Sequence, residues 1–235
     1  MDLIILPAHD EAATVGAVVR AIRQTVAADV LVIDDGSRDD TARVAAQAGA
    51  RVCSSGRQTG YGATMQRGFS YAVRRGYQRV ASVDADGQHD PAHLPQFLAL
   101  ASEWDVVSGT RYHPDSPSQG VAPPDRVRIN RELTARINAL TGWRLTDVFC
   151  GYKAYRVDAL SRLGLTETGY AFPMQFWMQA ARAGLRITEL PVGKIYLDVP
   201  RSFGLGLGDP CKRRAYYLQV LEDELGRSLL SAGAQ

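Results

Sequence analysis

Four short apolar runs, each followed at once by polar or acidic residues, constrain the fold of this chain more than any other feature. The runs are Leu3–Leu6, Val30–Ile33, Val80–Val83 and Val106–Ser108. Such runs without polar alternation are typical of strands buried on both faces of a parallel sheet. In the segments between these runs, apolar residues recur at helical spacing, as at Val15, Val18, Val19 and Ile22. The pattern predicts an α/β fold with a doubly wound, mostly parallel central sheet.

The rest of the chain gives weaker signals for further elements. Helices are predicted over 41–48, 61–75, 127–140 and 172–183, turn and strand signals mix over 146–156, and a strand is predicted over 185–197. Residues 113–124 contain four prolines and predict a long loop or mobile flap. After a glycine-rich loop over 201–209, Asp209 and Pro210 predict the start of a last helix running towards Leu225, a C-terminal helical elaboration.

Composition and charge exclude several classes of protein. The 235 residues, 46% hydrophobic and 22% charged, fit one α/β domain with an elaboration. A net charge of +2 is too small to predict a nucleic-acid partner. Cys53, Cys150 and Cys211 lie too far apart for a C-x-x-C motif, and reduced thiols in a cytoplasmic protein are expected. No apolar run approaches the roughly 20 residues that span a bilayer, so we expect neither an export signal nor a membrane helix.

The residues that follow the strands predict where a ligand binds. In open α/β sheets this is the edge at the carboxyl ends of the strands. The residues expected there are Pro7, Ala8, His9, Asp10 and Glu11, then Asp34 and Asp35, then Asp84, Ala85, Asp86, Gly87 and Gln88, and finally Arg111. Carboxylates crowded on one edge repel each other unless a cation or hydrogen-bond donors compensate them. The sequence therefore predicts an acidic rim, and a bound cation is one way to stabilise it.

A divalent metal would supply that cation. If the segment stays extended, Asp84, Asp86 and Gln88 project to one side, and Gly87 permits a tight turn. Oxygen ligands favour Mg²⁺ or Mn²⁺. The alternative is that Asp86, Gly87 and Asp90 only cap a turn before a helix near Pro91. Zinc held by His89 and His93 is disfavoured, because Pro91 intervenes and no third His or Cys is near.

Two further motifs have a local and a functional interpretation. In the segment 34–41, Ser37 and Asp40 predict a capping box, while Asp34 and Asp35 are better explained by contacts to a sugar or base. The glycines Gly60, Gly62 and Gly68 miss the G-x-G-x-x-G spacing, which disfavours a nicotinamide or flavin enzyme.

The last helix begins with Lys212, Arg213 and Arg214, which oppose the helix dipole. A solvated face is the ordinary explanation of such charges. The alternative is a basic turn that binds an anion, either an acceptor phosphate or anionic lipid headgroups.

Six motifs together resemble family-2 glycosyltransferases. They are PAHDE at 7–11, DDGSRDDT at 34–41, GYGATMQRGF at 60–69, DADGQHDP at 84–91, SGTRY at 108–112 and TDVFCGYKAYR at 146–156. The chain is most similar to the branch that contains dolichyl-phosphate mannosyltransferases and related polyprenyl-phosphate sugar transferases. The resemblance implies a GT-A fold and an inverting, Mg²⁺- or Mn²⁺-dependent transfer from a nucleoside diphosphate sugar, GDP-mannose or a UDP-sugar.

The resemblance also implies roles for individual residues. Pro7, Ala8, Glu11 and Asp35 hold the nucleoside; Asp84, Ala85, Asp86 and Gln88 hold the metal and diphosphate; Arg111 and Arg201 contact the donor and its phosphates; Asp147 lies on the acceptor side. Lys212 and Arg213 are expected on the acceptor side from their place in the basic turn, not from the resemblance. Residues 1–111 then form the nucleotide-sugar half, 112–124 the flap and 125–235 the acceptor half. The expected acceptor is a polyprenyl phosphate or another small molecule, reached by a cytoplasmic protein or one in peripheral contact with the inner face of the membrane.

Several alternatives stay open at this point. With a soluble hydroxyl acceptor, Asp147 is the candidate general base. A sugar-1-phosphate nucleotidyltransferase and a non-catalytic nucleotide-sugar-binding partner are the other two. Gln175 stands where many relatives have Glu, so no role of that carboxylate transfers to this chain, and His9 and Asp10 leave the nucleobase contact open.

Overall fold

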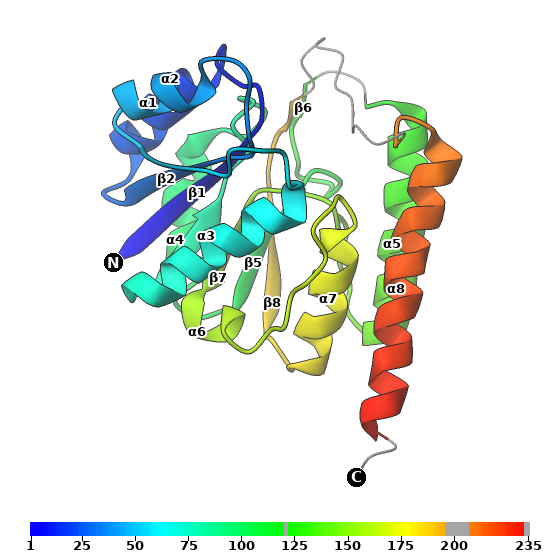
Figure 1. The fold of residues 1–235 in the computed structure, drawn as a ribbon. Helices are drawn as coiled ribbons and strands as arrows, with labels where there is room; N and C mark the ends of the chain where they lie inside the picture. The colour runs from blue at the N-terminus through cyan, green and yellow to red at the C-terminus, as the bar shows by residue number, and fades with distance from the viewer. Residues whose placement is uncertain (120–121, 196–206, 233–235) are drawn as a thin grey trace.

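A seven-stranded sheet forms the centre of the molecule (Figure 1). The computed structural model describes residues 1–119, 122–195 and 207–232. In the order β3-β2-β1-β4-β7-β5-β8, the strands are Arg51–Ser54, Asp29–Asp34, Asp2–Ala8, Arg79–Ser82, Lys153–Arg156, Val106–Thr110 and Ile187–Pro191. Only β7 runs antiparallel to its neighbours, β4 and β5. The predicted mostly parallel α/β sheet is confirmed.

Helices cover both faces of this sheet. α1 (Val15–Thr25), α2 (Thr41–Gln47), the 3₁₀ turn η1 (Pro91–His93) and α4 (Leu94–Leu100) lie on one face, and α3 (Tyr61–Arg75), α6 (Val157–Leu160) and α7 (Phe172–Arg182) lie on the other. The alternation of β1 explains the two cores, because Ile4 and Leu6 belong to the first and Leu3 and Ile5 to the second. β1 is thus buried on both of its faces.

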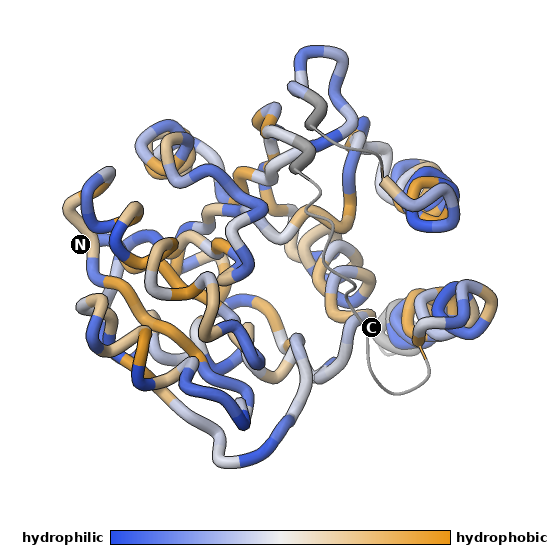
Figure 2. Tube along the Cα trace, turned by 90° about the horizontal axis from the view of Figure 1, so that it is seen from above, coloured by the Kyte–Doolittle hydropathy of each residue, from blue (hydrophilic) through white to orange (hydrophobic). Residues whose placement is uncertain are grey.

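Two long helices stand outside the layers. α5 (Pro124–Thr141) and α8 (Pro210–Ala232) run parallel beside α7, and the view from above shows both on one side of the molecule (Figures 1 and 2). Ion pairs join them along their length, Asp125 with Arg213, Glu132 with Arg214 and Arg136 with Glu222. α8 is the predicted C-terminal elaboration. No described helix has both the length and the apolar character needed to cross a membrane.

Some predicted elements differ from the observed ones. The strand β3 was not predicted, because this edge strand is mostly exposed and Val52 is its one partly buried aliphatic residue. The strand predicted over 185–197 ends at Pro191; a separate strand β9 (Lys194–Ile195) pairs with β6 (Ser118–Gln119). The predicted flap therefore contains a short strand, and α5 begins at its last proline, because proline suits the first turn of a helix.

Candidate active site

The carboxyl ends of four parallel strands meet as predicted. Ala8 of β1 is in register with Asp34 of β2, and Ile5 of β1 with Ser82 of β4. The N–H of Asp35 donates to the carbonyl oxygen of Ala8 at 2.8 Å, Pro7 pairs with Ile33, and the segment 84–88 follows the next strand along the sheet.

Asp34 and Asp35 are both buried and both hold loops of the chain itself. Asp34 accepts the N–H of Ser37 at 3.0 Å and the hydroxyl of Ser54. Asp35 accepts the N–H groups of Thr59 and Gly60, each at 2.8 Å. Burial alone raises the pKa of Asp34, but the donors from Ser37 and Ser54 outweigh it and lower the pKa. The two acids thus shape this edge of the site, a role that the sequence did not predict.

The loop after β1 is fastened to the segment 37–41. Asp10 has a φ of 55°, the one positive value among the described residues other than glycine. Its N–H bonds Ser37 at 2.9 Å, and the N–H of Glu11 bonds Thr41 at 2.7 Å. The predicted capping box is therefore wrong: Ser37 binds the first loop, and Asp40 pairs with Arg43. A strained backbone held from both sides is common at binding sites.

The segment 84–88 is a turn, so the prediction of an extended segment is wrong, whereas the role of Gly87 in a tight turn agrees with its φ of 77°. Asp86 is buried and accepts the N–H of Gln88 at 2.8 Å. The carboxylate of Asp84 lies against Gly151, where a Cβ would come within 2.8 Å of both its oxygens. Gly151 thus leaves the space that Asp84 occupies.

The donor set of this turn suits a hard cation completed by substrate. Among the described residues, no group of three or more His, Cys, Asp or Glu side chains is placed to hold a metal. Two carboxylates and an amide oxygen, with phosphate oxygens from a ligand, are nevertheless a usual environment for Mg²⁺. Asp84, Asp86 and Gln88 therefore fit a metal that binds together with a diphosphate.

His89 lies between this turn and the second half of the site. Its ring accepts the N–H of Asp84 at 3.2 Å and is buried. Burial lowers its pKa to about 4, and the ring interacts electrostatically with Asp86, Arg111 and Asp147. His89 is therefore neutral near pH 7 and marks where the two halves meet.

Arg111 and Asp147 form a bidentate ion pair at the end of β5. Arg111 Nε and Nη2 donate to the two carboxylate oxygens at 2.7 and 3.0 Å, and the N–H of Arg111 adds a third bond. Asn130 of α5 and the N–H of Phe149 also donate to Asp147, which is 0% exposed. Burial opposes ionisation, but Arg111 and Asn130 outweigh it and lower the pKa of Asp147. A carboxylate so occupied is a weak base.

A second carboxylate supports this pair from β8. Glu189 accepts the N–H groups of Thr146 and Asp147 and the hydroxyl of Thr146. Burial raises its pKa, although these donors oppose the rise.

On β7, Lys153 is buried, donates to the carbonyl of Cys150 and lies 5.4 Å from the ring centre of Trp177.

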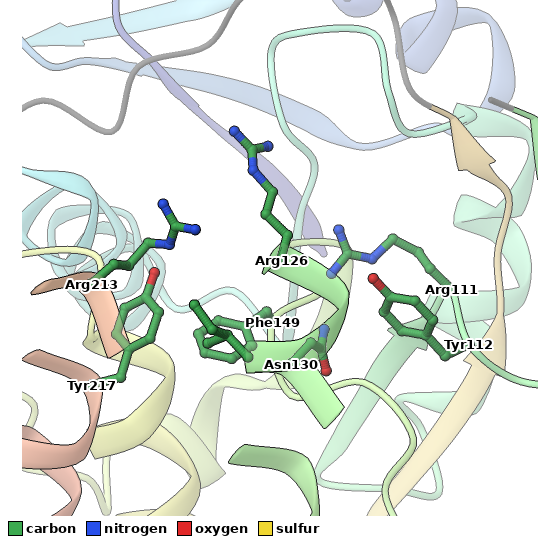
Figure 3. A pocket seen from close by; sticks show the side chains of 8 residues that line it. Arg111, Tyr112, Arg126, Asn130, Phe149, Arg213 and Tyr217 are labelled. Atoms are coloured by element: carbon green, nitrogen blue, oxygen red, sulfur yellow. The ribbon is translucent and has the colours of Figure 1, made fainter. Parts of the chain in front are cut away.

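A cavity of about 120 Å³ opens beside Arg111 (Figure 3). Its cationic lining consists of Arg111, Arg126 and Arg213, and the remaining lining residues are Tyr112, Ile129, Asn130, Phe149 and Tyr217. Arg126 and Arg213 lie in the first turns of α5 and α8, so the positive ends of two helix dipoles add to the arginine charges. The cavity can hold an anion that carries an apolar group.

Of the three basic residues at the start of α8, the structure places one, Arg213, in the cavity. Asp209 accepts the N–H groups of Cys211 and Lys212, which confirms the predicted start of the helix. Arg213 lines the cavity and pairs with Asp125, whereas Arg214 pairs with Glu132 outside it and Lys212 is exposed. Arg201 lies outside the described residues.

Four residues of the site were not predicted from the sequence. Arg126 and Asn130 lie four residues apart in a helix of otherwise ordinary charge pattern, and only the fold shows that they face Arg111. Glu189 sits inside a strand. Gly151 lies within the motif at 146–156, where a glycine before a strand was the available signal.

The doubly wound sheet with an acidic turn after β4 defines the GT-A class of nucleotide-sugar transferase folds. Solved structures agree: glucosyl-3-phosphoglycerate synthase from M. tuberculosis aligns with a TM-score of 0.75 at 22% identity, over 96% of this chain and 81% of that one. A mycobacterial protein aligns with a TM-score of 0.76 at 22% identity, over 96% and 75%.

Sequence comparison places the chain within that class. The pattern described as Glycosyl transferase family 2 matches residues 3–164, and the chain belongs to this family. An undecaprenyl-phosphate mannosyltransferase of Micrococcus luteus is 32% identical over 209 residues, 85% of this chain and 86% of the relative. A polyprenol monophosphomannose synthase of Mycolicibacterium smegmatis is 28% identical over 201 residues, 81% and 76%.

Proposed function

We propose that the protein transfers a hexose from a nucleoside diphosphate sugar to a polyprenyl phosphate. The observation that carries this proposal is the cavity with three arginines and an aromatic lining. Arginines bind phosphate oxygens through paired N–H donors, while Tyr112, Phe149 and Tyr217 offer apolar surface to a hydrocarbon chain. The names of the relatives from M. luteus and M. smegmatis, which specify polyprenol-type acceptors, support the same acceptor class.

The donor is assigned to the edge of the sheet. Pro7, Ala8, Glu11 and Asp35 form the nucleoside side, with residues 1–111 as the donor half. Asp84, Ala85, Asp86 and Gln88 hold the diphosphate and a Mg²⁺ or Mn²⁺ ion, which stabilises the negative charge of the leaving group when bound. The M. tuberculosis synthase structure with Mn²⁺ and UDP supports a metal of this kind.

The chain's own residues then act on the acceptor. Arg111, Arg126 and Arg213 place the acceptor phosphate, and one of its oxygens attacks the anomeric carbon as the bond to the diphosphate breaks, with inversion. The phosphate is already an anion, so no proton has to be removed. Asp147 orients Arg111, and its lowered pKa and N–H partners disfavour the alternative role of general base. Residues 125–235 form the acceptor half.

A matched pair of variants on α5 tests the acceptor assignment. Arg126 lines the cavity, whereas Arg128, two residues on, is exposed. We expect Arg126→Gln to raise the KM for undecaprenyl phosphate by about 10- to 100-fold. This factor corresponds to the free energy that one hydrogen bond to a charged group contributes to binding. Arg128→Gln is the control and should leave it unchanged.

Transfer from GDP-mannose and UDP-glucose to undecaprenyl phosphate is measured for each variant. Equal acceptor KM values for the two variants would remove the cavity from acceptor binding. Transfer only to a soluble hydroxyl acceptor, or release of nucleoside diphosphate without any glycosylated product, would replace the proposed acceptor class.

A further inference from the structure

Glu189 is placed to control the geometry of the Arg111–Asp147 pair without touching the cavity. One of its carboxylate oxygens accepts the N–H groups of Thr146 and Asp147 at 3.0 and 3.1 Å. The other accepts the N–H and the hydroxyl of Thr146 at 2.8 and 2.9 Å. The turn that presents Asp147 is therefore fixed by one side chain from β8.

The hydrogen bonds around Glu189 have one direction. A carboxylate only accepts, so the hydroxyl of Thr146 donates to Glu189. That hydroxyl then accepts the bond that it shares with Thr110, 2.6 Å away. The hydroxyl of Thr110 in turn accepts the N–H of Tyr112 at 3.3 Å. The series runs from the end of β5 to Glu189.

This series joins the two segments that carry the ion pair. Thr110 and Tyr112 flank Arg111, and Thr146 precedes Asp147. We propose that Glu189 is a positioning residue that holds both segments in register, so that the Arg111 guanidinium faces the acceptor phosphate. The catalytic meaning of this role rests on the function proposed above, but the geometric role does not.

Near-isosteric variants test the direction of the series. Glu189→Gln keeps the shape of the side chain but turns an N–H₂ group towards Thr146, whose N–H and hydroxyl both donate to that position. We expect kcat to fall about tenfold, because buried donors lose their acceptor, with the donor KM unchanged. Thr146→Val should lower kcat by a similar factor, whereas Thr146→Ser, which keeps the hydroxyl, should retain the wild-type kcat. The double variant Glu189→Gln with Thr146→Val should lower kcat little more than either single variant.

Asp105 provides the matched control. It lies at the other end of the same strand pair, where its carboxylate accepts the N–H of Arg186 at 2.8 Å. Asp105→Asn therefore removes a carboxylate charge, paired with Arg156 and Arg186, from the residue just before β5 and outside the lining of the cavity. It should reproduce any loss of stability but leave kcat unchanged.

The outcomes separate this inference from the proposed function. If the wild type transfers sugar to undecaprenyl phosphate and Glu189→Gln matches Asp105→Asn in kcat, the positioning role is overturned. If the wild type does not transfer, the proposed function fails, and crystal structures of the two variants decide. A displaced Arg111–Asp147 pair in Glu189→Gln supports the role, and an unchanged pair refutes it. If Glu189→Gln does not fold, Thr146→Val carries both measurements.

Discussion

At the scale of the residue, the site depends on charges that are buried and paired. Asp147 is 0% exposed, yet it stays ionised because Arg111, Asn130 and Phe149 supply N–H donors from three sides. Losing one partner of such a pair costs far more than the pair itself contributes. We therefore expect the Arg111–Asp147 pair to contribute to the stability of the fold.

Asp147→Asn should lower the free energy of unfolding by about 3–5 kcal/mol at pH 7, because Arg111 loses its buried partner. The folded pKa of Asp147 lies below its ordinary value of roughly 3.9. Its contribution is thus complete above that pH and is lost as the pH falls through the folded pKa. Urea unfolding of wild type and variant from pH 7 to pH 2 should show a gap that is constant at neutral pH and narrows only below about pH 4. Asp158→Asn, at an exposed ion pair with Arg156, is the control, and a gap independent of pH contradicts the assignment.

Gly62→Ala should destabilise the protein by about 1–3 kcal/mol through overpacking. A Cβ at this position of α3 would lie 2.2 Å from the backbone oxygen of Glu167. Gly226 in α8 has no atom within 4 Å of the same position, so Gly226→Ala should instead stabilise by about 0.5–1 kcal/mol. Thermal unfolding compares them; equal effects would mean that the contact with Glu167 can relax.

The location of a single residue was predictable where its position relative to a strand fixes where it lies in the fold. Pro7 lies near the end of β1, and Glu11 and Asp35 follow β1 and β2, so all three lie at the carboxyl edge of the sheet. Ser37 was misassigned because a local capping motif competed with a contact to Asp10, 27 residues away in the sequence. Such distant partners leave no periodic signal.

At the scale of the element, α7 and α8 are joined by a buried amide. Gln175 donates to Glu224 at 2.8 Å, and its carbonyl oxygen accepts the N–H groups of Thr166 and Glu167 at 2.6 and 2.7 Å. Glu224 also pairs with Arg182 and Arg227. An amide is the side chain that can donate to one side and accept from the other, which explains why Gln stands here.

Gln175→Glu should reduce the free energy of unfolding by on the order of 2 kcal/mol, because two carboxylates would face each other in a buried site. Adding Glu224→Gln should recover about half of that loss, a coupling expected for residues in contact. Gln179→Glu on the same helix is the control, since the side chain of Gln179 bonds the backbone of Gly164 rather than a carboxylate. Additive effects in a double-mutant cycle would show that the two side chains do not interact.

Strands with an unbroken apolar run were predictable, and strands defined by their neighbours were not. β1, β2, β4 and β5 carry their own burial signal. β7 is short, and its antiparallel direction follows only from its insertion between β4 and β5. β6 and β9 are two residues each and exist only as a pair.

At the scale of the whole molecule, donor and metal should stabilise the fold together. GDP or UDP at about 100 times its Kd with Mn²⁺ should raise Tm by about 5–10 °C, and excess chelator should abolish most of the shift. Asp86→Asn keeps the carbonyl that accepts the N–H of Gln88 and should lose the metal-dependent part. Asp223→Asn on the exposed face of α8 should keep it. A full shift in chelator would contradict the metal assignment.

The parallel arrangement of α5 and α8 has a practical consequence. Both helices begin at the cavity, and the 23 residues of α8 rise about 35 Å before the helix ends. A fluorophore or a surface tether attached at the end of α8 would therefore sit remote from the cavity. Immobilisation through that point should leave the arginine cavity open to ligands arriving from solution.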